Sequence, residues 1–565
     1  MEFAHRFFVT LFNAIINTMI FEDINGLLEG EVFNDKETLI KYSHDAGLFE
    51  VLPKMVVFPK NTSDIKKIVS FVTRQKKFYP ELSITARSAG TDMTGGPLTE
   101  SIVLDFTKHF NRINKVILIG GNARVRTEPG VFYRDFEKET LKVGYFLPSY
   151  PASREICALG GMVANNSGGE KTLKYGKTED YVLEIKVVLT DGEEYVIKPL
   201  SREDLFKKIK ENMFDGRIYK QIFELIESNY EKIKKAKPNV SKNSTGYNVW
   251  DVWDKKTFDL TKLFVGSQGT LGIITEIKLK LVRHNPNTGM MIIFLKDTGS
   301  LVDIINAVLP FRPSSFESFD DHTFKLALKF FSGFIKILAK NPISLAFSFL
   351  PDIFMVIKRG MPKLVLLVEF EESTQEEVDR KLYGLKRALN LFSVDSKISR
   401  TKEESEKYWA IRRESFNLLR QKIRGLGTAP FVDDIIVRPE YLPKFLPRLY
   451  AILDKYNLLY TIAGHMGDGN FHVIPLMKLS EEKERAKIPL VMDEVYNLIF
   501  EYKGSMSAEH NDGLIRSPYL EKMYGHEIYG IFKNVKDIFD PQNIFNPGKK
   551  IGATLAYALR HIRRG

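Results

Sequence analysis

Residues 152–176 read ASREICALGGMVANNSGGEKTLKYG, a segment unusually rich in glycine and asparagine. These residue types reach positive φ at low cost and leave backbone N–H groups accessible. Leu159, Met162 and Val163 lie between the glycines, which favours a buried, shaped loop over a flexible surface loop. We therefore expect a backbone that lies close against a ligand. The glycine and asparagine positions are Gly160, Gly161, Asn165, Asn166, Gly168 and Gly169.

Predicted strands adjoin this loop and two further glycine-rich segments. VLEIKVVLTDGEEYVI (182–197) predicts a hairpin that turns at Asp191-Gly192. ITARSAGTDMTGG (84–96) and LFVGSQGTLGIITEIKLKL (263–281) place the other two glycine-rich loops beside strands. Loops of this kind suit a large phosphate-bearing cofactor held by backbone N–H groups. The glycine patterns of a Rossmann site and of a P-loop are both absent from the sequence.

Composition limits the class of protein. A chain of 565 residues with 44% hydrophobic and 27% charged residues is typical of a folded soluble protein of two to four domains. A single cysteine, Cys157, excludes an intrachain disulfide and a cysteine-ligated cluster made by this chain alone, and it favours a reducing compartment. The net charge of +11 is compatible with an anionic ligand, a membrane or nucleic acid. Because no nucleic-acid-binding signature occurs, we expect no nucleic-acid partner.

The remaining pattern predicts a mixed α+β chain. Residues 3–21 predict a packed or membrane-touching helix rather than a signal peptide, because no small-residue cleavage site follows. VVFPKNTSDIKKIVSFV predicts a strand and then a helix capped by Asn61, Thr62 or Ser63. The pattern breaks at 283–288, and beyond it strands alternate with helices over 375–391 and 402–424.

Several motifs in a fixed order resemble a known family. They are ARSAGTDMTGG, EPGV, LGGMVANNSGG, KYGKTEDYV, GSQGTLGIITE, HMGDGNFH, AEHNDG and FDPQNIFNPGK, and they extend from about residue 53 to 550. The chain resembles the flavin-dependent D-2-hydroxy-acid dehydrogenases with a vanillyl-alcohol-oxidase-type (PCMH-type) FAD domain, which include D-lactate, glycolate and D-2-hydroxyglutarate dehydrogenases. The resemblance implies an N-terminal helical extension (1–50), a two-subdomain PCMH-type FAD-binding domain (51–284), an α+β substrate and metal domain with an antiparallel sheet (285–550) and a basic tail (551–565).

The resemblance also implies the residues that bind FAD. The segment Ser88-Ala89-Gly90-Thr91 lacks the histidine through which some relatives tether the flavin, so we expect FAD to be bound non-covalently. Cys157 lies near the position of a thioether link in distant relatives, but a small buried side chain is the favoured interpretation. The implied FAD-binding residues are Arg87, Ser88, Ala89, Gly90, Thr91, Asp92, Gly95, Pro151, Ala152, Gly160, Gly161, Ala164, Asn165, Asn166, Ser167, Gly168, Gly169, Gly269, Gly272, Ile273 and Asn546.

Three histidines and a glutamate form the predicted chemical centre. His465 and His472 flank a turn between two predicted strands, so both imidazoles can reach one metal ion. Two histidines and one glutamate are a usual set for Zn²⁺, with Mn or Fe as alternatives. The resemblance assigns His465, His472 and Glu509 as metal ligands and His510 as the general base. The metal would orient the 2-hydroxy acid while His510 takes the hydroxyl proton and a hydride passes to the flavin.

The resemblance places Arg412 on the substrate carboxylate, with Arg413 as the neighbouring alternative and Asn470 as a further polar contact. Three positions depart from the family pattern, namely Gln268, Ala508 and Asn511. Where D-2-hydroxyglutarate enzymes have a threonine and a lysine for the distal carboxylate, this chain has Phe416 and Val432. We therefore expect a substrate with a short or apolar side chain, such as D-lactate or glycolate.

Residues 323–363 form an apolar segment with seven basic residues and one acid, Asp352. On a helix at ~100° per residue, Lys325, Lys329, Lys336 and Lys340 fall within about 60° of arc. This pattern predicts either an interfacial helix on anionic lipid or an insertion packed on its own domain or on a second subunit, as in a homodimer. The lipid interpretation favours a quinone acceptor and a cytoplasmic protein at the inner face of the membrane. An iron–sulfur or electron-transfer protein is the alternative acceptor.

Two rival hypotheses remain from the sequence. One is an FAD oxidase that uses dioxygen, and the other is a catalytically silent binding or membrane-scaffold protein of the same fold. The four residues His465, His472, Glu509 and His510 argue against the silent protein, because a scaffold has no evident use for them.

Overall fold

The computed structural model describes residues 17–323, 325, 360–399, 401, 404–413 and 425–564. Most of the predicted interfacial segment, the first part of the N-terminal helix and Phe416 therefore lie outside the described residues. Residues 17–27 and 404–413 are helical, in agreement with the sequence pattern. No helix in the described ranges combines the length and apolar character needed to cross a bilayer.

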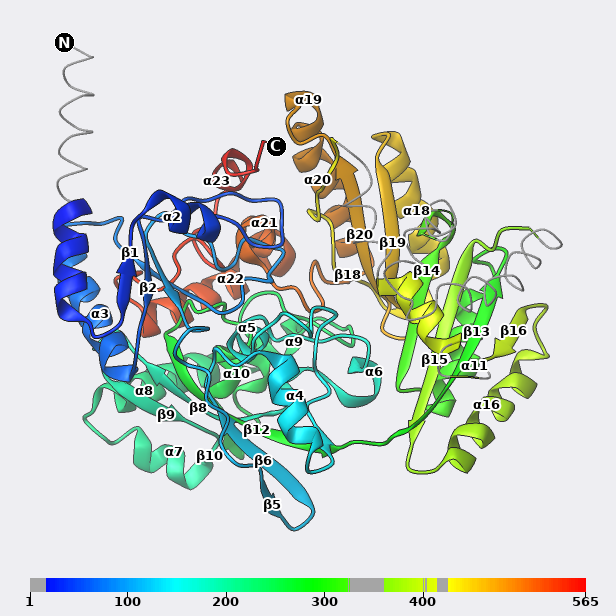
Figure 1. Cartoon of the computed structure of the whole chain (residues 1–565), viewed down its shortest axis with the longest axis horizontal. Coiled ribbons are helices and arrows are strands. Elements are labelled where there is room, and N and C mark those ends of the chain that lie inside the picture. Colours follow the sequence, from blue (N-terminus) through cyan, green and yellow to red (C-terminus); the bar gives the residue numbers. More distant parts are fainter. Residues whose placement is uncertain are drawn as a thin grey trace.

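The first sheet is formed near the N-terminus and lies in one half of the molecule (Figure 1). Its order is β1-β2-β4-β3, with β2, β4 and β3 parallel and β1 antiparallel. Asn61, one of the three predicted candidates, caps the helix α3, and its side chain accepts a hydrogen bond from the N–H of Asp64. The bounds are β1 Glu31–Phe33, α2 Lys36–Tyr42, β2 Met55–Phe58, α3 Thr62–Gln75, β3 Ile84–Arg87 and β4 Ile102–Asp105.

The second sheet contains the predicted hairpin. Strands β8 and β9 pair antiparallel across the Asp191-Gly192 turn, and β12 lies between β6 and β8. The sheet strands are β5 Ile117–Ile119, β6 Asn122–Thr127, β7 Tyr145–Phe146, β8 Val182–Val188, β9 Glu194–Ile197 and β12 Ile273–Arg283, and β10 Leu200–Ser201 pairs separately with β11 Thr257–Phe258. The helices of this region are α4 Tyr133–Leu141, α5 Leu159–Asn165, α6 Thr172–Tyr175, α7 Arg202–Lys208, α8 Phe214–Ser228, α9 Tyr230–Ala236 and α10 Thr261–Phe264.

The other half of the molecule is an eight-stranded antiparallel sheet with helices packed on one face (Figure 1). Alternation along the strands places Phe316, Ile462 and Phe471 in the core beneath the helices, which leaves Glu317 and His472 on the opposite face. The strands are β13 Asn287–Leu295, β14 Ser315–Asp320, β15 Leu364–Glu372, β16 Asp395–Ile398, β17 Gly427–Thr428, β18 Ile435–Ile436, β19 Leu459–His465 and β20 Asn470–Met477. The helices are α11 Leu301–Val308, α16 Gln375–Leu389, α18 Leu442–Lys455, α19 Glu482–Arg485 and α20 Lys487–Glu501.

The C-terminal part of the chain returns to the first half. Phe532 and Phe539 of α22 pack in the same core as Trp250 and Tyr219, and Phe545 forms a bridge with Ile84 of β3. This segment, which lies within the predicted domain 285–550, thus completes the core of the other half. The last helices are α21 Gly513–Arg516, α22 Leu520–Phe539 and α23 Leu555–Arg560. The α+β class with an antiparallel C-terminal sheet is confirmed.

Candidate active site

A cavity of about 690 Å³ lies between the glycine-rich segments and the open face of the eight-stranded sheet. Residues from all three predicted glycine-rich loops line it, together with His465, His472, Glu509 and His510. The structure thus brings the predicted cofactor segments and the predicted chemical centre, far apart in sequence, to one site.

Most of the predicted FAD-binding residues line this cavity. Gly95, Asn166, Ile273 and Asn546 do not, although Asn546 donates hydrogen bonds to the carbonyls of Gly96 and Gln268 and so joins two of the loops. The predicted residues on the lining are Arg87, Ser88, Ala89, Gly90, Thr91, Asp92, Pro151, Ala152, Gly160, Gly161, Ala164, Asn165, Ser167, Gly168, Gly169, Gly269 and Gly272.

The glycines make room for a ligand. A Cβ added at Gly161 or Gly269 would meet no atom closer than 3.8 Å, so each glycine leaves open space at the cavity wall. A Cβ at Gly160 would instead lie 2.6 Å from the Cβ of Pro129, because the helix α5 packs closely there. The cavity wall of bare backbone therefore fits a flat, phosphate-bearing cofactor such as FAD. Cys157 also lines the cavity, but burial raises the pKa of its thiol to about 12, which favours the small-side-chain interpretation.

The predicted metal ligands converge on one point. The Nε2 atom of His465 is 3.0 Å from Oε1 of Glu509 and 3.3 Å from Nε2 of His472, and the latter is 3.5 Å from the same glutamate oxygen. Ligand atoms about 2.0–2.1 Å from a tetrahedral Zn²⁺ are about 3.3 Å apart. The donor set and its spacing therefore fit a divalent metal ion.

Asp434 offers an alternative ligand, because one of its oxygens lies within 4.8 Å of ligand atoms of His472, Glu509 and His510. However, Oδ2 of Asp434 already accepts hydrogen bonds from the N–H groups of Glu509 and His510 and from the hydroxyl of Ser507. These bonds commit Asp434 to holding the loop, so His465 is the better third ligand.

Asp433 connects His472, a predicted metal ligand, with the predicted base His510. Its Oδ1 accepts a hydrogen bond from Nδ1 of His472 at 3.1 Å, and its Oδ2 accepts one from Nδ1 of His510 at 2.6 Å. Burial lowers the pKa of His472, but Asp433 and Glu509 raise it more, to about 10. Burial likewise lowers the pKa of His510, and Asp433 and Asp434 raise it above its usual value. Because Asp433 engages Nδ1 of both rings, their Nε2 atoms face away from it.

The substrate-binding candidates lie in different surroundings. Arg412 lines the cavity and pairs with Glu317, with its Nε 3.2 Å from Oε2. Arg413 also lines the cavity and forms a bidentate pair with Glu170. Asn470 does not line the cavity, because its buried amide group donates to Asp434 and to the carbonyl of Ile435.

The three departures from the family pattern lie behind the cavity wall or on it. Gln268 lines the cavity and accepts a hydrogen bond from the N–H of Gly513. Asn511 donates to the carbonyls of Asn165 and Gly266, and the carbonyl of Ala508 accepts from the buried Lys177. These residues join the loops from the two halves of the chain. Val432 is fully buried and is absent from the cavity lining.

Several polar residues around the histidine cluster were not predicted. Glu317 and Asp433 accept hydrogen bonds from the histidines, and the buried Lys242 lies 3.2 Å from Oε2 of Glu509. For Glu317 and Asp433, the sequence offered one signal, namely acidic residues within the apolar, strand-like segments FESFD (316–320) and FVDDII (431–436). A buried carboxylate in such a segment requires a polar partner. The sequence does not name that partner.

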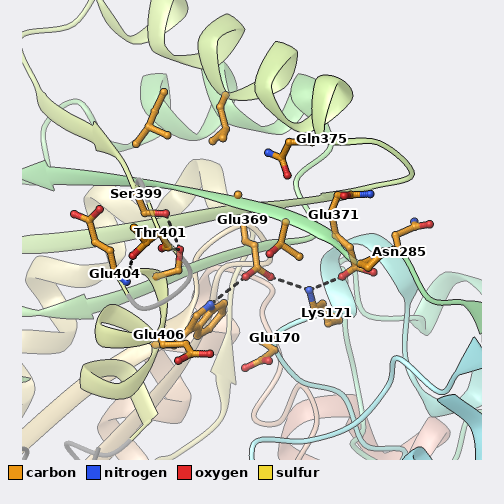
Figure 2. Close-up of a pocket in the computed structure, with 18 of the residues that line it drawn as sticks. Glu170, Lys171, Asn285, Glu369, Glu371, Gln375, Ser399, Thr401, Glu404 and Glu406 are labelled. Carbon is orange, nitrogen blue, oxygen red and sulfur yellow. Dashed lines mark hydrogen bonds and ion pairs between the residues drawn. The ribbon is translucent and has the colours of Figure 1, made fainter. Parts of the chain in front are cut away.

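A larger cavity of about 1420 Å³ borders the first one (Figure 2). The two share Arg154, Glu170, Trp409 and Arg413. In the larger cavity Lys171 lies between the carboxylates of Glu369 and Glu371, 2.8 and 2.6 Å away (Figure 2). This ion-pair network joins the loop after α5 to strand β15 and therefore holds the two halves of the molecule together beside the site.

Two family models match the chain in succession. The FAD binding domain matches residues 53–198, and the C-terminal domain of FAD linked oxidases matches residues 287–550. The chain therefore combines an FAD binding domain with a C-terminal domain of the FAD linked oxidase type, as its motifs indicated.

The chain is similar to D-2-hydroxyglutarate dehydrogenase of Escherichia coli (strain K12), with 28% identity over 516 residues that cover 90% of this chain and 49% of that protein. It spans about half the length of this and three other D-2-hydroxyglutarate dehydrogenases. Glycolate oxidase subunit GlcD of Bacillus subtilis (strain 168) is 27% identical over 531 residues, which cover 92% of this chain and 94% of that protein.

A solved structure of p-cresol methylhydroxylase with substrate bound has a similar fold. Its TM-score is 0.67 at 17% identity, with 95% of this chain and 97% of that chain covered. At this identity the likeness concerns the fold alone, and it agrees with the predicted PCMH-type architecture.

Proposed function

We propose that the protein oxidises a short D-2-hydroxy acid, of the D-lactate or glycolate type, to the 2-oxo acid. The proposal is supported by one observation above the others. A single cavity is lined both by the three glycine-rich segments expected to bind FAD and by the cluster of His465, His472, Glu509 and His510. An enzyme of this kind needs a hydride acceptor next to the reacting carbon of the substrate. It also needs a proton acceptor next to the hydroxyl group on that carbon.

We assign each residue a role that its position in the cavity supports. When bound, FAD supplies a hydride acceptor, and a divalent metal, Zn²⁺ or alternatively Mn or Fe, supplies a Lewis acid for the hydroxyl oxygen. His465, His472 and Glu509 would hold the metal, and Arg412 would bind the substrate carboxylate. His510 would take the hydroxyl proton on Nε2, because Asp433 engages its Nδ1. Asp433 also stabilises the positive charge that His510 gains.

The cavity wall supports a short, uncharged substrate side chain. Thr461, Ala463 and Ile474 line the cavity on the sheet face that carries His465 and His472. None of these three side chains offers a cation for a second carboxylate.

We further propose that electrons leave the flavin to a quinone or to a protein acceptor. The name of the glycolate oxidase relative describes it as a subunit, which supports a protein partner. Peripheral contact of a cytoplasmic protein with the membrane through 323–363 would support a quinone. Loss of binding to anionic vesicles in a purified variant lacking 323–358 tests this contact, provided that the variant retains its flavin.

The first experiment is an anaerobic visible spectrum of the purified protein, reconstituted with FAD and Zn²⁺. D-lactate, glycolate and D-2-hydroxyglutarate are then added in turn, with the L-lactate enantiomer as the control. We expect bleaching of the flavin band by D-lactate or glycolate. A protein that binds no flavin, or whose flavin none of these acids reduces, would favour the silent binding protein. After air is admitted, formation of one hydrogen peroxide per substrate oxidised, at the rate of turnover, would instead identify an oxidase.

A further inference from the structure

The buried carboxylate of Glu317 connects two groups that the proposed function uses separately. Its Oε1 accepts a hydrogen bond from Nδ1 of His465 at 2.6 Å, and its Oε2 lies 3.1 Å from a terminal nitrogen of Arg412 and 3.2 Å from Nε. Glu317 is 1% exposed. Each carboxylate oxygen therefore has its own partner, one on the predicted metal site and one on the predicted substrate site.

Strand register explains why Glu317 reaches His465. Strands β14 and β19 pair antiparallel, and Glu317 lies directly opposite His465. Side chains of directly opposed residues lie about 4.5–5.5 Å apart at Cβ on the same sheet face. The contact is thus built into the backbone of the sheet and does not depend on a flexible loop.

The hydrogen bond selects the tautomer of His465. An ionised carboxylate only accepts hydrogen bonds, so Nδ1 of His465 carries the hydrogen. In the neutral ring, Nε2 then presents its lone pair toward Glu509 and His472, where a metal ion would be bound. On the other side, two nitrogens of Arg412 share the remaining oxygen of Glu317, which restricts the orientation of the guanidinium group.

We propose that Glu317 is a positioning residue that orients the metal ligand His465 and the carboxylate-binding Arg412 as one unit. This inference rests on the proposed function. A 2-hydroxy acid carries its hydroxyl and carboxylate on adjacent carbons, so the metal and the guanidinium group must be at a matching short separation. One carboxylate that holds both groups sets that separation.

The neighbouring arginine provides a structural contrast. Arg413 is also paired with a glutamate, Glu170, but no hydrogen bond joins Glu170 to the histidine cluster among the described contacts. Glu317 differs from Glu170 because, in addition to its arginine, it binds His465 through its second carboxylate oxygen.

The test compares Glu317→Gln with Glu369→Gln, both in FAD-loaded protein. Glu369 is a matched control, because it is a buried glutamate on the adjacent strand β15 and does not contact the histidine cluster. In the variant Lys171 keeps its contact with Glu371, and the amide oxygen of glutamine can still accept the hydrogen bond from Trp409. The readouts are Zn²⁺ affinity by chelator competition, flavin content, and KM and kcat for the acid that reduces the flavin. Zn²⁺ affinity is measured without turnover, so it is independent of activity.

We expect Glu317→Gln to lower Zn²⁺ affinity by about 10–100-fold and to raise KM by at least tenfold at saturating Zn²⁺, with flavin content unchanged. Glu369→Gln should change neither quantity by more than about threefold. A variant whose Zn²⁺ affinity equals that of the wild type, or whose KM is normal once Zn²⁺ is restored, would overturn the linked role. If Glu317→Gln fails to fold, Glu317→Asp replaces it, because the shorter side chain cannot keep both contacts and should show both defects.

Failure of the proposed function is distinguishable from failure of this inference. A wild-type protein that binds flavin but no divalent metal would refute the metal site and, with it, the role of Glu317. A wild-type protein that binds Zn²⁺ and oxidises the acid, combined with an unaffected Glu317→Gln variant, would refute the role of Glu317 alone.

Discussion

Gly160 and Gly161 provide a direct test of where the cofactor lies. They are adjacent in the helix α5, neither has positive φ, and both line the cavity. A Cβ at Gly161 meets only the Cβ of Ser88, at 3.8 Å, whereas a Cβ at Gly160 lies 2.6 Å from the Cβ and 2.8 Å from the carbonyl oxygen of Pro129. Alanine at the two positions should therefore have opposite effects on the apoprotein.

The expected magnitudes follow from these contacts. Gly161→Ala should stabilise the apoprotein by about 0.5–1 kcal/mol, because alanine is the better helix former and the space is open. Gly160→Ala should destabilise it by on the order of 1 kcal/mol, because an overpacked contact costs about 1–3 kcal/mol and exceeds the helical gain. With FAD present, the new methyl group of Gly161→Ala occupies space at the cavity wall. If the clash between this methyl group and FAD costs about 1–3 kcal/mol, as an overpacked contact does, FAD affinity falls by about 5–150-fold.

The assay combines denaturant unfolding of the apoprotein with FAD titration followed by flavin fluorescence. Gly530→Ala is the matched control, because Gly530 lies in the helix α22, away from the cavity lining, with no atom within 4 Å of an added Cβ. It should show the helical gain and wild-type FAD affinity. Wild-type FAD affinity in Gly161→Ala, together with the expected gain in stability, would refute the placement of FAD against α5.

Three further predictions concern the chemistry and the stability of the site. His510→Ala should bind FAD and Zn²⁺ normally but reduce its flavin about 10²–10⁴-fold more slowly in stopped-flow experiments, and a normal rate would remove His510 from the role of base. Chelation should abolish turnover while the flavin stays bound, as judged by absorbance after desalting, and full activity in a metal-stripped sample would refute the metal role. Burial raises the pKa of Glu170, but Arg413 lowers it more, to about 2. At pH values above the ordinary carboxyl pKa, the ionised Glu170 therefore stabilises the folded state. This stabilisation is lost as the pH falls toward the lowered pKa. Glu170→Gln should therefore cost about 1–3 kcal/mol at pH 7, a difference that shrinks as the pH falls from about 5 to about 2. A pH-independent difference in urea unfolding would contradict this account.

Local sequence patterns were sufficient for the elements that carry the site. The glycine-rich segments, the Asp191-Gly192 hairpin and the cap at Asn61 each depend on residues within a few positions of one another. The hairpin β19–β20 likewise brings His465 and His472 together through a four-residue turn, so their proximity follows from the local sequence. Backbone propensity and turn chemistry act over this range, and therefore a single sequence reveals them.

These local patterns did not predict contacts between residues that are far apart in the sequence. Glu317 meets His465 across 148 residues, and Lys242 meets Glu509 across 267, because distant strands and loops are neighbours in the folded chain. The same holds for α22, which follows the eight-stranded sheet in sequence but completes the core of the other half. Alternation along a strand indicates which residues share a face, but the order of strands in a sheet depends on how whole layers bury their apolar surfaces. The supporting carboxylates of the site are consequently a property of the tertiary structure.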